Sequence, residues 1–208
     1  MLNLIIHNKT DEQTQKLNEI MKNGAGLFAE AQAGEACYAD SQGWLDTKEW
    51  AGEDTLSHIE ALAQEIRERA DAFVLIGVGG SNNAARSVVE ALKQDDAPEI
   101  IYAGNTLSPH ALKQMLKKLK GKSIYIDCIA KNFETLEPGS SFRILREYME
   151  AEYGKEEAAR RTIAVGTTGS SLEELCTKYG YTFLEFPLNI GGRYTAMTNV
   201  GLLPMAVA

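Results

Sequence analysis

The chain has 208 residues and a formal net charge of -8 at pH 7, with 44% hydrophobic and 24% charged residues. This length suits one domain of ordinary size, or one domain with an additional arm. The acidic balance argues against a dedicated nucleic-acid-binding protein, which would carry a basic patch. No apolar run approaches the roughly 18 residues that a membrane helix needs.

The cysteines and the first residues of the chain indicate the cellular compartment of the protein. Cys37, Cys128 and Cys176 are odd in number and form no C-x-x-C motif. Such usage is typical of a reducing environment rather than of a disulfide framework, so we expect a cytoplasmic protein. Residues 1–10 are briefly apolar but lack a basic lead and a small-residue cleavage site. We therefore expect a strand or packing segment there and not a signal peptide.

Residues 1–70 are expected to form a helical arm. In residues 11–22 the apolar side chains fall on one helical face, and Gly24, Gly26 and Gly34 interrupt the pattern beyond it. Residues 43–46 (GWLD) indicate a turn that carries Trp44 as an aromatic anchor. Residues 54–69, with Asp54 as a plausible N-cap, show an apolar stripe at helical spacing.

Residues 71–187 show a different rhythm, in which amphipathic helical patterns separate short apolar runs. The runs are continuous and rich in β-branched or aromatic residues, as strands buried on both faces should be. This alternation predicts an α/β fold with a doubly wound, flavodoxin-like parallel sheet of five strands. The expected strands are 72–76, 100–103, 124–129, 162–165 and 182–186.

The last residues, 194–208, are almost wholly apolar and show no polar stop signal. One interpretation is a terminal helix docked into the core. The other is a chain cut inside a larger protein, because a free chain seldom ends in an unprotected apolar helix.

A glycine-rich turn, residues 77–81 (GVGGS), follows the first expected strand and opens a helix. The carboxyl end of a parallel strand is where ligands bind. Glycines let the backbone approach a ligand, and Ser81 adds a hydroxyl beside free helix N–H groups. The dinucleotide fingerprint fails because Asn82 occupies its third glycine position. On this evidence a structural turn and a ligand site remain equally open.

Two further segments follow later strands. In residues 130–138 (AKNFETLEP), Lys131 and Thr135 could hold a phosphate, although an ordinary loop with Thr135 as a helix cap is the commoner case. In residues 189–194 (NIGGRY), two glycines allow Arg193 to approach a ligand closely. A rigid, permanently charged guanidinium suits a developing oxyanion. The alternative is a surface arginine after a turn.

Together these segments resemble the glucose-6-phosphate isomerase family. NIGGRYTAMTNVG (189–201) resembles a signature motif of that family, with Thr195 where a serine is usual, and VLIGVGGSNNAARSVVEAL resembles its GIGGS segment. GWLD, LEPGSSFRILREYMEAEYGKEEAARR and GLLPMAVA also look like bacterial members. The resemblance covers roughly residues 43–208.

The resemblance implies two sugar-isomerase (SIS) α/β domains in the family. This chain would supply N-terminal helices (1–70), the first SIS domain (71–187) and the start of the second (188–208). Gly80 and Ser81 would contact the sugar phosphate, and Lys131 and Thr135 its phosphate. Arg193 would be catalytic, lying beside the reacting carbons to stabilise an enediolate.

The family's reaction interconverts glucose 6-phosphate and fructose 6-phosphate in glycolysis and gluconeogenesis. The resemblance implies no cofactor, no metal and a homodimer. The phosphate loop of the family reads S-K-[ST]-x-T-T, and this chain departs from that pattern. Here Ala130 and Asn132 remove hydroxyl donors, and Glu134 adds a carboxylate. Like charges a few Å apart repel by roughly a few kcal/mol at an effective dielectric near 20, which predicts weakened phosphate binding.

The proton transfer in this family needs a glutamate, a histidine and a lysine that follow the G-G-R motif beyond residue 208. His7, His58 and His110 match none of these positions, and we expect His58 and His110 at the surface. The sequence thus predicts an incomplete N-terminal fragment of the isomerase, inactive alone. One alternative is a catalytically inactive sugar-phosphate-binding or regulatory module, and another is a structural protein with a decayed site.

Overall fold

The computed structural model describes residues 7–34, 41–131 and 133–208. They form two compact units, one ending at Gln42 and the other beginning at Gly43. Most of the packing segment expected at the start of the chain, and Cys37, lie outside the described residues.

The first unit contains one long helix, α1 (Asp11–Gln32). Thr10 opens it with a capping box, in which the Thr10 hydroxyl accepts from the Gln13 amide at 3.2 Å and the Gln13 side chain accepts from the Thr10 amide at 3.0 Å. The expected interruption at Gly24 and Gly26 is wrong, because α1 runs through both. Glycine inside a helix costs only about 1 kcal/mol relative to alanine, which a 22-residue helix with a capped start can absorb.

The second unit is built on one sheet of five parallel strands in the order β2-β1-β3-β4-β5. This confirms the doubly wound parallel sheet, with each strand within one residue of its predicted bounds. The order reverses between β1 and β3, and such switch points are where open α/β sheets bind ligands. The strands are β1 (Ala72–Ile76), β2 (Glu99–Ala103), β3 (Ile124–Ala130), β4 (Thr162–Gly166) and β5 (Thr182–Glu185).

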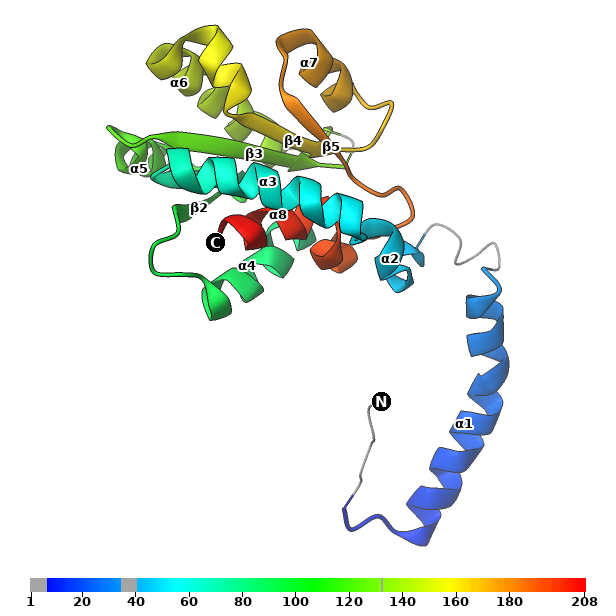
Figure 1. The fold of residues 1–208 in the computed structure, drawn as a ribbon. Helices are drawn as coiled ribbons and strands as arrows, with labels where there is room; N and C mark the ends of the chain where they lie inside the picture. The colour runs from blue at the N-terminus through cyan, green and yellow to red at the C-terminus, as the bar shows by residue number, and fades with distance from the viewer. Residues whose placement is uncertain (1–6, 35–40, 132) are drawn as a thin grey trace. The chain divides into compact units, whose positions relative to one another are not determined.

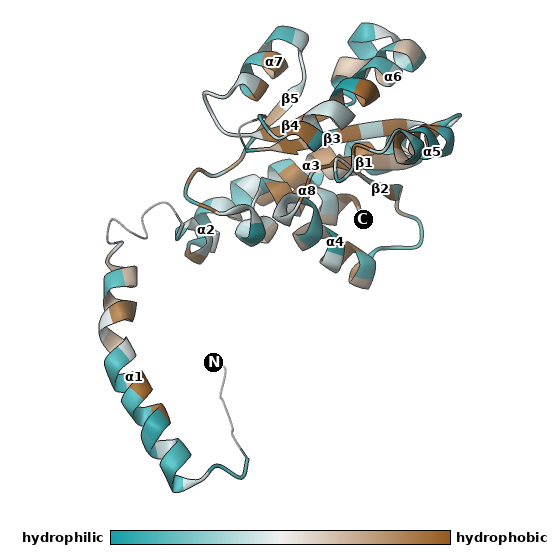
Figure 2. Cartoon of the chain, turned by 180° about the vertical axis from the view of Figure 1, so that it is seen from behind, coloured by the Kyte–Doolittle hydropathy of each residue, from teal (hydrophilic) through white to brown (hydrophobic). Residues whose placement is uncertain are grey.

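Helices cover both faces of this sheet (Figure 1). Alternate strand residues point to opposite faces, so that Val74 packs in one core with Leu145 of α6, and Phe73 packs in the other with Ile66 of α3. One face carries α5 (Pro109–Leu119), α6 (Leu136–Arg160) and α7 (Ser171–Tyr179), and the other carries α3 (Glu53–Arg69), α4 (Gly80–Leu92) and α8 (Asn199–Val207). The apolar colours of Figure 2 concentrate on the strands between these layers.

Helices α3 and α8 pack against each other on one face of the sheet. Helix α3 starts at Glu53 after Gly52, so the expected N-cap at Asp54 is wrong; Asp54 instead lies in the first turn, where a carboxylate favours the helix dipole. Helix α8 is the apolar end of the chain, and Val200, Leu203 and Val207 are buried in the core that includes α3. The docked helix considered from the sequence is therefore present.

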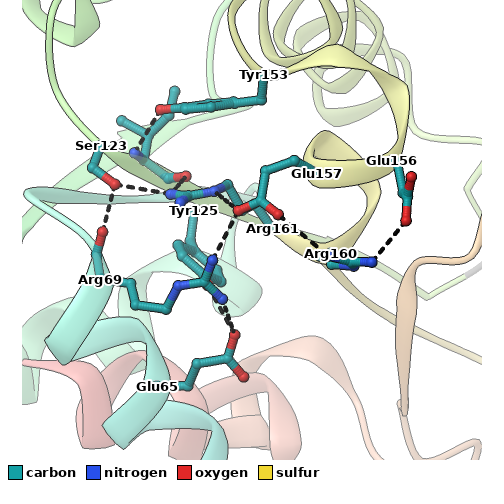
Figure 3. Close-up of polar contacts among 10 residues, drawn as sticks. Glu65, Arg69, Ser123, Tyr125, Tyr153, Glu156, Glu157, Arg160 and Arg161 are labelled. Atoms are coloured by element: carbon teal, nitrogen blue, oxygen red, sulfur yellow. Dashed lines mark hydrogen bonds and ion pairs between the residues drawn. The ribbon is translucent and has the colours of Figure 1, made fainter.

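A cluster of charged and aromatic side chains connects the elements at the amino edge of the sheet (Figure 3). Arg161, just before β4, places its guanidinium carbon 5.1 Å from the ring centroid of Tyr125 and 4.7 Å from that of Tyr153. It also donates to the carboxylate of Glu157 at 2.7 Å and to the Ser123 hydroxyl at 2.8 Å. These contacts join the ends of α6, β3 and β4.

The same cluster extends to α3. Arg69 donates to Glu65 at 3.0 Å and to Glu157 at 2.9 Å, and the Tyr125 hydroxyl donates to Glu65 at 2.9 Å. Burial, followed by the hydrogen bond to Glu65, raises the pKa of Tyr125 to about 12. The hydrogen bond from Arg161 lowers the pKa of Glu157.

Candidate functional site

The turn after β1 is closed by its own side chains and backbone. Gly77 extends the ladder by donating to the Ala103 carbonyl at 3.0 Å, and Gly79 adopts φ +61°, which favours glycine. Helix α4 then starts at Gly80, with Ser81 half-buried in its first turn. The buried amide of Asn82 donates to the Gly77 carbonyl at 3.4 Å. Asn82 thus helps to hold the glycine turn in place.

The loop after β5 packs directly on this turn. A Cβ added to Gly80 would stand 2.1 Å from the Gly192 carbonyl oxygen and 2.5 Å from the Arg193 amide nitrogen. Such distances are possible only because Gly80 has no side chain. The structure therefore brings two of the three predicted segments, those of Gly80–Ser81 and Arg193, into backbone contact.

Arg193 lines a groove that it shares with aromatic side chains. It is exposed and lies in η2 (Gly192–Met197) next to Tyr194, whose ring stacks on Trp44 with centroids 5.1 Å apart. Trp44 lies in the turn expected at residues 43–46, which forms η1 (Gly43–Leu45) ahead of α2 (Thr47–Trp50). Arg193 and three aromatic residues, Trp44, Trp50 and Tyr194, line a groove of about 450 Å³ together with Leu45, Thr47, Ile190, Ala196, Met197 and Thr198.

Lys131, at the carboxyl end of β3, reaches the loop that carries the arginine. Its Nζ donates to the carbonyl oxygens of Leu188 at 2.8 Å and Ile190 at 3.2 Å, and it lies 5.7 Å from the ring centroid of Phe186. Two of the three N–H donors of the ammonium group are therefore engaged by the protein. Among the described residues, none accepts from the third donor.

Thr135 lies apart from these contacts. It is exposed and occupies the N-cap position of α6, as the alternative of a helix cap predicted, although its side chain makes no capping hydrogen bond to the described backbone of that helix. It lines a groove of about 320 Å³ with Glu134, Arg143 and Arg146. The carboxylate of Glu134, which departs from the family's pattern, thus borders the same groove as Thr135, the residue expected to bind the phosphate.

Phe133 shapes the floor of this groove. It has φ +55°, a conformation that bulky residues seldom adopt, and its ring packs edge-on against Phe142 with centroids 5.9 Å apart. The loop therefore directs an apolar ring, rather than a polar group, toward the helix that follows it.

The core contains a buried carboxyl group that was not predicted from the sequence. Asp127, in the middle of β3, is fully buried, and neither carboxylate oxygen has a hydrogen-bond partner among the described residues. Burial raises its pKa well above the usual value. A charged residue inside an apolar run such as IYIDCIA is the signal that could have identified it.

The remaining candidates lie at the surface. His58 and His110 are exposed, as expected, and so is His7. Across the described ranges no three His, Cys, Asp or Glu residues are grouped as metal ligands would be. No helix within the described part of the chain has both the length and the apolar character needed to cross a membrane.

Comparison with known proteins places the whole second unit in one family. Residues 13–208 match the family model described as phosphoglucose isomerase. The glucose-6-phosphate isomerase of Staphylococcus saprophyticus is 34% identical over 204 residues, which are 95% of this chain and 45% of that protein. That of Acetivibrio thermocellus is 38% identical over 180 residues, 81% of this chain and 40% of that protein. The chain thus spans less than half the length of these relatives.

Solved structures agree on the fold. A hypothetical protein from Thermus thermophilus superposes with a TM-score of 0.78 at 22% identity, covering 91% of this chain and 46% of the other. A glucose-6-phosphate isomerase from Chlamydia trachomatis gives a TM-score of 0.66 at 21% identity, covering 75% and 30%. At such identities the likeness concerns the fold alone.

Proposed function

The chain belongs to the phosphoglucose isomerase family, and on that premise we propose that it supplies the sugar-phosphate-binding part of a glucose-6-phosphate isomerase. One observation carries the proposal. The glycine turn after β1 and the Gly192–Arg193 segment after β5 are in backbone contact at the carboxyl edge of a parallel sheet. That edge is where open α/β sheets bind ligands.

Arg193 is the group that we assign to the reaction. Moving a proton between the carbons of an aldose and a ketose passes through an enediolate, whose oxygen carries developing negative charge. A fixed guanidinium stabilises such an oxyanion without having to change its protonation state. We assign no proton-transfer step to a residue of this chain, because the family's glutamate, histidine and lysine would follow the G-G-R motif.

Binding of the sugar phosphate is assigned to the remaining predicted residues. Gly80 and Ser81 open α4, whose first N–H groups and dipole favour an anion. Lys131 offers its third N–H donor, and Thr135 an exposed hydroxyl at the start of α6. Glu134 beside Thr135 opposes the phosphate charge, so we expect weak binding at that end of the site.

Several finer assignments follow from the same premise. We propose that the protein acts in glycolysis and gluconeogenesis in the cytoplasm, as a homodimer. We also propose the division into N-terminal helices (1–70), a first SIS domain (71–187) and the start of a second (188–208). The compact unit beginning at Gly43 includes α3, which packs on the sheet through Ile66, so α3 shares a core with the sheet.

A second candidate is a sugar-phosphate-binding or regulatory module without isomerase activity. It is favoured by the altered β3–α6 loop, in which Phe133 packs inward and Glu134 borders the groove of Thr135. The two candidates share the binding site and differ only in turnover.

Calorimetric titration with 6-phosphogluconate, an open-chain sugar phosphate, tests the shared site. We expect binding by the unmodified chain and at least about tenfold weaker binding by Arg193→Ala, the loss expected when one charged hydrogen bond is removed. Arg160→Ala, in which an exposed arginine distant from the carboxyl edge is removed, is the control. No binding at all, or equal binding by Arg193→Ala, would contradict the proposal. Because this chain supplies no proton-transfer residue, turnover of fructose 6-phosphate by the full-length gene product then separates the isomerase from the module.

A further inference from the structure

We propose that Lys131 is a positioning residue that tethers the β5–η2 loop and thereby places Arg193. The inference rests on the proposed function only for what the site binds, since the tether itself is a property of the unliganded chain. The ammonium group joins the carboxyl end of β3 to residues 188–190, immediately before the Gly191–Gly192–Arg193 turn.

The geometry of the tether fixes two points of the loop. The Nζ–O distances of 2.8 Å to Leu188 and 3.2 Å to Ile190 are normal for charge-assisted hydrogen bonds. Both acceptors are backbone carbonyls, so the tether acts on the course of the chain and not on a side chain. The Lys131 carbonyl also accepts from the Thr167 amide at 3.2 Å, which fixes the base of the lysine beside β4.

The carbonyls of Leu188 and Ile190 differ in which hydrogen-bond donors could take the place of the Lys131 ammonium group. Leu188 is exposed, and water can bond its carbonyl when the ammonium is removed. Ile190 is fully buried as a residue, so its carbonyl has fewer alternative donors, and a buried acceptor without a partner is unfavourable. Removing the ammonium should therefore move the chain at Ile190, two residues before Gly192, which packs on Gly80.

Two backbone amides that donate hydrogen bonds to the loop can report on whether the loop has moved. The Gly43 amide donates to the Asn189 carbonyl at 2.9 Å, between the two acceptors of Lys131, and the Tyr194 amide donates to Gly191 at 2.9 Å. The Gly77 amide, which donates to Ala103 at 3.0 Å at the end of β1, reports on the sheet. Protection of the first two amides relative to the third therefore measures the loop separately from the fold.

Amide hydrogen exchange measured by NMR on the full chain tests the tether without any ligand. In Lys131→Met we expect exchange at Gly43 and Tyr194 to become at least about tenfold faster, and exchange at Gly77 to change less than about twofold. Lys131→Arg, which keeps a cationic donor, should restore most of the protection. Lys113→Met, an equal change at an exposed position of α5, should alter none of the three amides.

Unchanged exchange at Gly43 and Tyr194 in Lys131→Met would overturn the proposal. So would an equal acceleration at all three amides, because Lys131 would then stabilise the fold in general. In parallel, 6-phosphogluconate should bind more weakly to Lys131→Met than to Lys131→Arg. Failure of the unmodified chain to bind this compound would contradict the proposed function and leave the exchange result unaffected.

Discussion

Gly80 and Gly192 meet backbone to backbone, so closely that a Cβ on Gly80 would lie 2.1 Å from the Gly192 carbonyl oxygen. The two residues come from opposite ends of the folded unit's sequence, one after β1 and the other after β5. Their contact sets the distance between the glycine turn and Arg193, and it depends on the absence of a single side chain.

Gly80→Ala should therefore separate the two segments. We expect a loss of about 1–3 kcal/mol in the free energy of unfolding, typical of overpacking, and weaker binding of 6-phosphogluconate. Gly139→Ala in the first turn of α6, where an added Cβ meets nothing within 4 Å, is the matched control and should be neutral or slightly stabilising. Urea denaturation measures the first effect and calorimetry the second. Equal stability of the two variants would contradict this account of the contact.

Glu134→Gln should strengthen phosphate binding. The carboxylate borders the groove of Thr135, and removing one negative charge near a phosphate should raise affinity by about tenfold, equivalent to about 1.4 kcal/mol at intermediate dielectric. Glu147→Gln, at an exposed position of α6, is the control for net charge. Titration with 6-phosphogluconate at low ionic strength measures the difference. If both variants bind equally, the phosphate does not bind near Thr135.

Arg161 and Arg160 are neighbours with different surroundings. The Arg161 side chain is only 11% exposed and contacts two aromatic rings and Glu157, whereas that of Arg160 is 64% exposed. Arg161→Ala should lower the free energy of unfolding by about 2–4 kcal/mol, and Arg160→Ala by less than about 0.5 kcal/mol. Thermal and urea unfolding of both variants test this. Similar losses would show that the aromatic contacts contribute little.

Asp127 should make stability depend on pH. Because burial raises its pKa in the folded state, the folded chain holds a proton that the unfolded chain releases above about 3.8. Stability should therefore fall as pH rises from that value toward the folded-state pKa, by up to about 1.4 kcal/mol per pH unit.

Asp127→Asn should remove this part of the pH dependence. Relative to the unmodified chain it should gain stability as pH rises, and urea denaturation at several pH values between about 4 and 8 measures the gain. Asp95→Asn, in an exposed segment, is the control and should follow the unmodified chain. Parallel pH profiles of Asp127→Asn and the unmodified chain would show that the carboxyl group finds a partner in solution.

The three central strands β1, β3 and β4 were predictable because they are buried on both faces, whereas the edge strands β2 and β5 are only partly buried. In β1 every residue from Ala72 to Ile76 is buried, so the apolar run and the strand coincide. Helix α1 was predicted less well, since glycines at 24 and 26 suggested a break that local propensity alone did not impose. Propensity differences near 1 kcal/mol are too small to decide the course of a long helix.

The site was predictable as a set of segments but not as a set of contacts. Residues at the tips of parallel strands were expected at one edge, and Gly80, Lys131 and Arg193 follow strands that end there, although β5 is not a neighbour of β1 or β3. The pairing of Lys131 with the Leu188 and Ile190 carbonyls depends on how the loop after β5 returns across the sheet. No local pattern in the sequence reports that path.

The cluster around Arg161 has a consequence for how the protein can change. It locks the amino edge of the sheet, whereas the loops at the opposite edge are short and contribute few residues to the core. The cluster and the proposed ligand site thus lie at opposite edges of one sheet. A loop at the carboxyl edge should therefore tolerate changes of sequence, and with them changes of the proposed ligand specificity, while the folded framework is retained.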